Sequence, residues 1–444
     1  MKAIKNISIY TGGENPLFIK NGALVWDKDK IIKIVENNFD EKNFDGEIID
    51  GKGKLLIPGL IIAHNHLYSA LSRGIEMKNG NPRNFYQILT KLWWKLDLAL
   101  DKESIYYSAL IGIIDAIKSG VTTMIDHHAS FGYILGSLDE IERASTEIGI
   151  RMSTCFEVSD RFGEDKRKES IKENLRFIEK NIKRKDGMIA PTFGLHALFT
   201  IGENTLKECA EIGNHYKTSF HTHIAEDRFD RDYNLKFYNL SPIERLLKEK
   251  MLNEKTLLIH CVHIDEEDKE IIKENDSIVV HNPESNMNNA VGLPDVFELL
   301  NRGILVGLGT DGFTQDIFRE TQVLYIAHKH NKKDSNVGFS ESNKIVFVNN
   351  PEIVKRIFGI ETGIIKEGTK ADFVLLDYTP PTPLNEKNFF GHLIFGLSSR
   401  FVTDVIINGN YILKNRVFKN IDEEKILKES EVITKKLWER FDSI

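Results

Sequence analysis

The stretch Ile57-Pro58-Gly59-Leu60-Ile61-Ile62-Ala63-His64-Asn65-His66 is an apolar run that opens after Pro-Gly and ends in two histidines. Successive side chains of a strand point to opposite faces, so His64 and His66 share one face and can hold one ion between them. The alternative is a pair of half-exposed histidines at a strand end, because a short motif stays a hypothesis until its context supports it. The residues elsewhere in the chain distinguish an ion-binding pair from a pair of surface histidines.

Strand-like runs and helical patterns alternate downstream of this stretch. With residues 55–64 as the first strand, the count reaches eight, which is typical of an α/β protein with a (β/α)8 TIM barrel. The active site of such a barrel lies at the carboxyl ends of its strands. The connection over residues 66–104 is long enough to cover the barrel mouth. The other expected strands are residues 121–127, 151–158, 188–195, 218–224, 256–262, 277–281 and 304–309, and the expected helices include 104–118, 138–147, 169–182, 243–250 and 296–301.

Both ends of the chain alternate like short strands separated by Gly and Asp turns. The first segment has too few strands to enclose a core, so we expect the last segment, with strands over 364–365, 371–377, 402–408 and 411–416, to complete its sheet. The predicted domains are a discontinuous β-sandwich of residues 1–55 and 363–444 and a barrel of residues 56–362. A charged amphipathic helix over residues 423–441 is expected to pack against the protein.

Composition limits the classes of function. The 444 residues are 41% hydrophobic, and Lys and Arg nearly balance Asp and Glu, with a net charge of −7, which disfavours nucleic acid as a partner. Three distant cysteines, Cys155, Cys209 and Cys261, argue against a disulfide framework, and nothing marks Cys261 as a nucleophile. The chain lacks a signal-like start and an uncharged run of about 18 residues, so we expect a cytoplasmic protein without a membrane span.

Polar residues collect where strands four to eight end, as a barrel active site requires. Histidines account for most of them, and scattered core or surface histidines would not gather in this way. The strand-end residues are His196, His221-Thr222-His223-Ile224-Ala225-Glu226, His260-Cys261-Val262-His263, His281-Asn282-Pro283-Glu284-Ser285-Asn286 and Gly309-Thr310-Asp311-Gly312.

These pieces, taken in order, resemble the ligand and catalytic set of the amidohydrolase superfamily, and above all its branch of aminohydrolases that act on purines, triazines and related heterocycles. Within that branch the chain resembles the SsnA group of aminohydrolases. The resemblance covers essentially the whole chain. The residues that carry the narrower match are His64-Asn65-His66-Leu67-Tyr68-Ser69, Ser72-Arg73-Gly74-Ile75, Leu92-Trp93-Trp94, Asp126-His127-His128-Ala129-Ser130, Ser285-Asn286-Met287-Asn288-Asn289 and Gly368-Thr369-Lys370-Ala371-Asp372.

The resemblance implies one divalent metal ion held by His64, His66, His223 and Asp311. Three imidazoles and a carboxylate suit Zn²⁺ or Fe²⁺ better than Mg²⁺, and we favour Zn²⁺ over Fe²⁺. Strand four has no lysine of the kind that, carbamylated, bridges two metals in other branches, which indicates a mononuclear site. His221 shares the face of His223 and is the rival ligand, although the His-x-x-Glu spacing favours His223.

The resemblance also implies the chemistry of the site. The metal would lower the pKa of a bound water towards about 7 and supply hydroxide. Glu226 would move the proton of that water to a ring nitrogen of the substrate, and His260 would stabilise the attacking hydroxide. Asp311 would bind the metal and also carry a proton to the leaving amine.

Substrate contacts are less sharply indicated. His196 is expected to face the pocket, with a core histidine bonded to backbone as the alternative. Arg73 is either a substrate anchor or one half of a structural ion pair. Trp93, with Trp94, can stack on a planar ring, unless both are simply buried in the added helix. His281 lies where the family places a polar group on strand seven.

Three functions remain open at this point. The first is a deaminase that removes an exocyclic amine from a nitrogen heterocycle such as a purine. The second opens a ring at a cyclic amidine or amide with the same machinery. The third is a metal-binding accessory protein without catalysis, against which the complete ligand and acid–base set argues. The expected partner is a small heterocyclic substrate, and a homodimer is plausible for this family.

Overall fold

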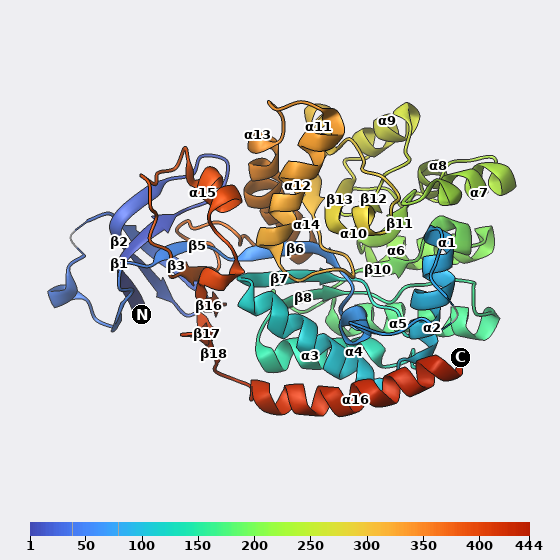
Figure 1. Cartoon of the computed structure of the whole chain (residues 1–444), viewed down its shortest axis with the longest axis horizontal. Coiled ribbons are helices and arrows are strands. Elements are labelled where there is room, and N and C mark those ends of the chain that lie inside the picture. The colour runs from blue at the N-terminus through green and yellow to red at the C-terminus, as the bar shows by residue number, and fades with distance from the viewer. Residues whose placement is uncertain (38, 79) are drawn as a thin grey trace.

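The expected strands form a parallel barrel in the computed structural model, which describes residues 1–37, 39–78 and 80–444 (Figure 1). They pair in the orders β6-β7-β8-β9 and β10-β11-β12-β13-β14. β9 and β10 are one expected strand interrupted at Thr192, so the eight predicted barrel strands are confirmed. The strands are β6 Leu60–Asn65, β7 Val121–Asp126, β8 Arg151–Thr154, β9 Ile189–Pro191, β10 Phe193–Leu195, β11 Phe220–Ile224, β12 Leu257–His260, β13 Ile278–His281 and β14 Val306–Leu308.

Helices follow the barrel strands and surround them, so the strands are buried on both faces. Every residue of β6, β7, β8 and β11 to β14 is buried. The five predicted helices are present, with shifts at their ends. The helices from the barrel are α3 Lys102–Lys118, α4 Ser137–Ile148, α5 Glu164–Asn181, α6 Glu203–Tyr216, α7 Arg228–Tyr238, α8 Pro242–Lys248, α9 Glu266–Glu274, α10 Pro283–Asn288, α11 Val296–Asn301, α12 Ile317–Lys332, α13 Phe339–Lys344 and α14 Asn350–Phe358.

The apolar run before His64 is two strands, not the single one predicted. β5, Leu55–Pro58, pairs with strands of the terminal sheet, and β6 begins the barrel after Gly59. A side chain at Gly59 would place its Cβ 2.2 Å from Thr122 Oγ1, so only glycine fits where the chain passes from one sheet to the other. The terminal sheet therefore extends to Pro58, beyond the predicted boundary at residue 55.

Both ends of the chain do build one sheet, as expected. Its nine strands include the order β18-β17-β16-β15-β5-β1-β2-β3, with β4 beside β1. Ile31 N donates to Thr369 O at 2.9 Å, so the edge strand β3 lies beside the segment that leads into β15. The curved sheet encloses a core that contains Trp26. The residues 364–365, predicted as a strand, form none. The strands are β1 Lys2–Tyr10, β2 Phe18–Asp27, β3 Lys30–Val35, β4 Glu47–Asp50, β15 Phe373–Leu376, β16 Val402–Ile407, β17 Asn410–Lys414 and β18 Val417–Phe418.

The long connection after β6 lies over the barrel mouth, as its length predicted. It runs through η2, Leu67–Ser72, and α1, Phe85–Ile88, to a π-helical turn, η3 Leu89–Trp93, that leads into α2, Trp94–Ala99. This segment carries both tryptophans of the Leu92-Trp93-Trp94 motif.

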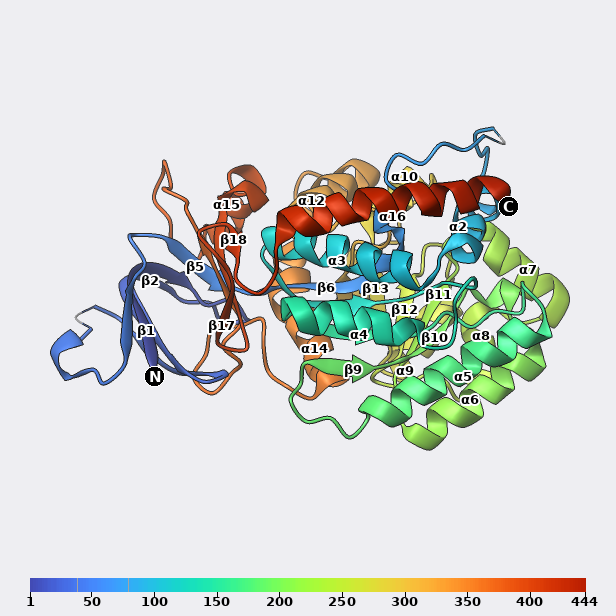
Figure 2. The same ribbon diagram turned by 90° about the horizontal axis from the view of Figure 1, so that it is seen from below.

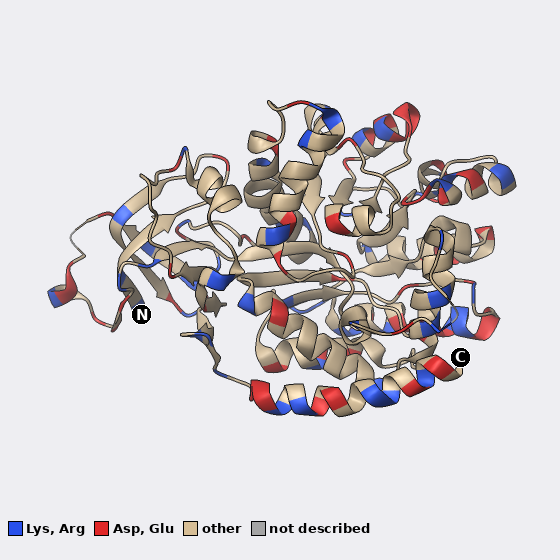
Figure 3. Cartoon of the chain, viewed as in Figure 1, with Lys and Arg blue, Asp and Glu red and all other residues tan. Residues whose placement is uncertain are grey.

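The C-terminal helix α16, Glu423–Ser443, leaves the terminal sheet and lies along α3 and α2 (Figure 2). Trp438 Nε1 donates to Leu71 O at 2.9 Å, and Arg440 Nε donates to Ala99 O at 2.7 Å. Charges of both signs alternate along its outer face (Figure 3). Among the described helices, none is long and apolar enough to cross a membrane. The remaining helices are α15 Phe389–Phe395, η1 Glu41–Asn43, η4 Leu198–Thr200, η5 Ile345–Asn349 and η6 Ser399–Phe401.

A buried ion pair joins the barrel to the terminal sheet. Arg151 Nη2 on β8 lies 2.8 Å from Asp372 Oδ2, and both side chains are 0% exposed. Asp372 also accepts from Thr362 Oγ1 at 2.6 Å and from Asn408 N at 2.6 Å. The carboxylate at the end of the Gly-Thr-Lys-Ala-Asp motif therefore holds three separate segments together.

Asp372→Asn is expected to lower the free energy of unfolding by about 3–5 kcal/mol, because it leaves the Arg151 guanidinium buried without its counter-charge. Urea unfolding followed by circular dichroism measures this loss. The matched control is Glu424→Gln on α16, whose side chain is 88% exposed beside Lys428 and which should change stability by less than about 0.5 kcal/mol. Equal effects of the two substitutions would contradict a role for Asp372 in joining the domains.

Candidate active site

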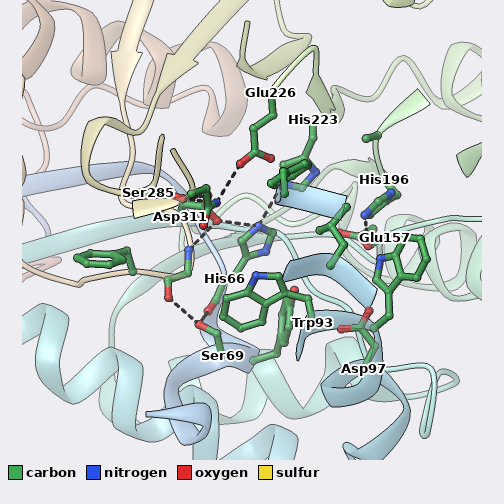
Figure 4. A pocket seen from close by; sticks show the side chains of 18 of the residues that line it. His66, Ser69, Trp93, Asp97, Glu157, His196, His223, Glu226, Ser285 and Asp311 are labelled. Carbon is green, nitrogen blue, oxygen red and sulfur yellow. Dashed lines mark hydrogen bonds and ion pairs between the residues drawn. The ribbon is translucent and has the colours of Figure 1, made fainter. Parts of the chain in front are cut away.

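Four side chains that the sequence singled out converge at the carboxyl end of the barrel, and Figure 4 shows three of them, His66, His223 and Asp311. His64 and His66 come from the end of β6, His223 from β11, and Asp311 from the loop after β14. His66 Nε2 lies 3.1 Å from Asp311 Oδ1 and 3.1 Å from His223 Nε2. His64 Nε2 is 3.9 Å from Asp311 Oδ1. The barrel thus brings groups from three strand ends to one point.

Hydrogen bonds behind these imidazoles direct one nitrogen of each into the cluster. His66 Nδ1 donates to His127 O at 2.6 Å, so the lone pair of its neutral form is on Nε2. His64 Nδ1 lies 2.8 Å from His221 Nε2, and among the described residues His64 Nε2 is buried without a hydrogen-bond partner. Burial, together with the neighbouring imidazoles, holds the pKa of both His64 and His223 well below 6.5, which favours the neutral ligating form.

The donor set fits a divalent metal ion. In the described part of the chain, ligand atoms fall into overlapping groups whose members all lie within 4.8 Å of one another. His221 belongs to none of these groups, because its Nε2 is engaged by His64. It lies behind His64, where it fixes the orientation of that imidazole. The groups are His64–His223–His260, His66–His127–His223, His64–His66–Asp311 and Glu226–His260–Asp311.

Two further predicted groups, Glu226 and His260, lie beside the cluster. His260 Nε2 is 3.4 Å from Glu226 Oε2 and 3.6 Å from Asp311 Oδ2. Burial, and then the nearby Asp311 carboxylate, raise the pKa of Glu226 well above its usual value. A carboxyl group that keeps its proton near neutral pH can donate that proton to a substrate and take it back.

The short helix α10 holds all three acid–base groups in place. Ser285 Oγ donates to Asp311 Oδ2 at 2.5 Å, and Asn289, just after the helix, donates from Nδ2 to Glu226 Oε1 at 3.1 Å. Asn286 Oδ1 lies 3.2 Å from His260 Nδ1. The Ser285–Asn289 motif therefore positions the site. The sequence indicated this motif only as part of the family resemblance, without a role for Asn286 in the site.

Four residues of the same region have strained backbone conformations. Non-glycine residues with positive φ include Ala225 at 45°, His260 at 72°, Cys261 at 52° and Asp311 at 53°. Such conformations are uncommon for residues other than Gly, Asn and Asp, and they persist where surrounding contacts fix them. Ala225 N, for example, donates to Asp230 Oδ2 at 2.8 Å.

A pocket opens beside the cluster. Aromatic residues of the connection over the mouth form one wall, and acidic and histidine side chains form the other. The lining residues are His66, Tyr68, Ser69, Phe85, Leu89, Trp93, Trp94, Asp97, Glu157, His196, Ala197, His223, Glu226, Ser285, Asn288, Asn289, Asp311, Gly312 and Phe313.

The structure separates the four expected substrate contacts into two pairs. His196 and Trp93 line the pocket. Arg73 does not, because its side chain is 69% exposed and pairs with Asp115 Oδ2 at 2.7 Å, which is the structural alternative weighed above. His281 does not either, since it is buried behind the site with its Nε2 3.0 Å from His328 Nε2.

Two acidic residues that line the pocket, Glu157 and Asp97, and the arginine behind them were missed. Glu157 lies just past the end of β8, and the rule that found the polar ends of strands four to eight would have found it on strand three. Asp97 lies on α2, and its place over the mouth depends on tertiary packing. Arg161 bonds both, with Nη1 2.9 Å from Glu157 Oε1 and Nη2 2.6 Å from Asp97 Oδ2.

Comparison with known proteins agrees with this geometry. Residues 55–412 match the model of the Amidohydrolase family. A 5-methylthioadenosine/S-adenosylhomocysteine deaminase of Acetivibrio thermocellus is 32% identical over 438 residues, covering 95% of this chain and 96% of the relative. A 5'-deoxyadenosine deaminase of Methanobrevibacter smithii is 31% identical over 427 residues, covering 94% of each.

Solved structures of the same fold include an adenosine deaminase from Xanthomonas campestris with bound zinc, with a TM-score of 0.85, 19% identity and coverage of 100% of this chain and 99% of that one. A guanine deaminase from C. acetobutylicum with bound guanine has a TM-score of 0.78 and 19% identity, covering 92% of this chain and 99% of that one. The family model alone spans most of the sequence. The chain belongs to the amidohydrolase family.

Proposed function

We propose that this chain is a metal-dependent aminohydrolase that hydrolyses the bond between a ring carbon and an exocyclic amine of a purine-type heterocycle. The observation that carries the proposal is the convergence of three imidazoles and a carboxylate beside Glu226, whose pKa is raised by burial. The deaminase names of the relatives support the same reaction.

His64, His66, His223 and Asp311 would hold the metal, and the buried, unpartnered Nε2 of His64 supports that fit. Nitrogen-rich donor sets suit Zn²⁺, which we favour over Fe²⁺, and a structural relative contains zinc. When bound, such an ion makes hydroxide available at neutral pH by lowering the pKa of water. Its charge also favours the ionised Asp311.

The protein's own groups would move the protons. Glu226, placed by Asn289, donates its proton to a ring nitrogen of the substrate and so makes the adjacent carbon more electrophilic. His260, whose Nδ1 donates to Asn286 Oδ1, would accept a hydrogen bond from the attacking water at Nε2. Asp311, held by Ser285, passes a proton to the departing amine, which leaves as ammonia. Water is consumed, and the carbon exchanges its amine for an oxygen.

The aromatic wall would orient a flat ring for this attack. Trp93 and Trp94 line the pocket across from the histidines, and Tyr68 lies with its ring 6.5 Å from that of Trp93. Aromatic faces bind planar heterocycles through stacking and burial of apolar area. Cytoplasmic location, a homodimer and membership of the SsnA group stay predictions from the sequence.

Metal binding gives the first test. We expect about one equivalent of zinc per chain by mass spectrometry, with His66→Ala or His223→Ala losing it. His221→Ala should retain the metal but bind it about 10- to 100-fold more weakly, because that residue only orients His64. Loss of zinc in His221→Ala but not in His223→Ala would reverse the ligand assignment, and a wild-type chain without affinity for metal would refute the proposal.

Glu226→Gln is expected to reduce the rate of ammonia release by about 10²- to 10⁴-fold without changing the zinc content, since the amide cannot carry the proton. The assay screens aminopurines and aminopyrimidines for ammonia while ring absorbance is recorded. The control, Glu164→Gln, changes a side chain that is 69% exposed on α5 and should behave as wild type. Loss of ring absorbance without ammonia would instead indicate ring opening.

A further inference from the structure

Glu157 is the centre of the pocket wall that the proposed reaction does not use. Its Oε1 accepts from Arg161 Nη1 at 2.9 Å and lies 3.6 Å from His196 Nε2, while its Oε2 is 3.4 Å from His127 Nδ1. The side chain is 3% exposed and lines the pocket. Burial alone would raise the pKa of Glu157, but His196, Arg161 and His127 together hold it well below its usual value, so the wall presents a fixed carboxylate.

Asp97 adds a second acceptor to this wall. Arg161 engages its Oδ2, and its Oδ1 is buried without a hydrogen-bond partner among the described residues. Arg161 is itself 4% exposed, with its guanidinium carbon 4.5 Å from the ring centroid of Phe131. The cation therefore fixes the two carboxylates from behind and does not offer itself to a ligand.

The pocket surface offers an anionic group no cationic side chain. Among the described residues that line it, four are acidic, and none is lysine or arginine. Arg161 is already bonded to Glu157 and Asp97, so a phosphate or carboxylate placed there would be buried without a partner of its own, which is unfavourable. Burial raises the pKa of Asp97 to about 7, whereas the pKa of Glu157 is lowered, so a group that bonds to the Glu157 carboxylate has to be a donor.

The position of Glu157 indicates which part of a substrate it meets. It contacts His127, whose ring centroid is 4.8 Å from that of His223, and His196, whose ring centroid is 6.1 Å from that of His223. Only the width of one imidazole thus separates Glu157 from a candidate metal ligand. A donor bound at Glu157 therefore belongs to the heterocycle that reacts, not to a distant substituent.

We propose that Glu157, fixed by Arg161 and assisted by Asp97, is a specificity-determining residue that accepts a ring N–H of the substrate. The substrate class is an uncharged aminolactam-type base, in which an exocyclic amine accompanies at least one ring N–H. The adenine ring of a nucleoside has only acceptor nitrogens in the ring, so it offers no ring N–H to Glu157. This inference rests on the proposed deaminase function and narrows its substrate.

The first experiment compares substrates with the unmodified zinc-loaded protein. Guanine and isocytosine carry ring N–H groups, whereas 5'-deoxyadenosine and 5'-methylthioadenosine present hydroxyl donors on the sugar and none in the ring. We expect ammonia release with a kcat/KM at least about 10-fold higher for the bases. Preference for the nucleosides would overturn the inference and leave the deaminase function standing. Absence of ammonia from both arms would refute the deaminase function and the inference with it.

The second experiment removes the donor and the acceptor in turn. The two substrates to compare with guanine are its N1-methyl and N9-methyl derivatives. We expect one of them to show a kcat/KM about 10- to 100-fold lower, which corresponds to the loss of one hydrogen bond to a charged acceptor. In Glu157→Gln that penalty should shrink by about 10-fold, since the partner has lost its charge. A steric clash of the methyl group would leave the penalty unchanged, and that outcome would overturn the proposal.

Binding supplies a readout that does not depend on turnover. Quenching of the pocket tryptophans by guanine and its methylated forms gives dissociation constants in the wild type, in Glu157→Gln and in the control Glu164→Gln. We expect only Glu157→Gln to lose discrimination between the two ligands. Asp97→Asn serves as the second variant should Glu157→Gln fail to fold, and it should show a smaller loss in the same direction. Undiminished discrimination in these variants would contradict the assignment.

Discussion

The seam between the first and the last barrel strand is the contact on which the site depends. Thr310 N donates to His64 O at 2.9 Å, and His66 N donates to Asp311 O at 3.4 Å. These backbone hydrogen bonds close the barrel and, in the same step, bring two imidazoles and a carboxylate that are far apart in sequence to one point. Gly309 is required here, because a Cβ would lie 2.8 Å from His64 Cβ and O. The same contacts therefore close the barrel and assemble the candidate metal site.

Surrounding contacts hold four residues of the site in strained backbone conformations. Ala225, His260, Cys261 and Asp311 hold left-handed backbone conformations, each of which costs of order 1–3 kcal/mol where the residue is not glycine. Backbone bonds offset part of this cost, as where Cys261 N donates to Ile224 O at 3.0 Å. Natural proteins accept such local strain at functional sites, because it orients side chains that a regular strand would direct elsewhere.

The sequence predicted the structure correctly where the periodicity of side chains along a strand decides which residues lie together. Alternation along β6 and the rule that barrel sites lie at strand ends located His64, His66, His223, Glu226, His260 and Asp311 together. The prediction failed at Gly59, because the apolar residues continue without interruption although the chain passes there from one strand to the next. It also failed at His281, which lies at a strand end but faces His328 and not the pocket. Asp97 lay beyond reach, because only the packing of the inserted segment over the mouth brings it to the pocket.

The bonds from α16 to Leu71 and Ala99 make the pocket sensitive to a distant helix. Trp438 Nε1 donates to Leu71 O, and Arg440 Nε donates to Ala99 O, so the C-terminal helix holds the segment over the mouth at both of its ends. Trp93 and Asp97, which line the pocket, lie between these two attachments. A change that loosens α16 therefore alters the shape of the pocket without touching any residue that lines it.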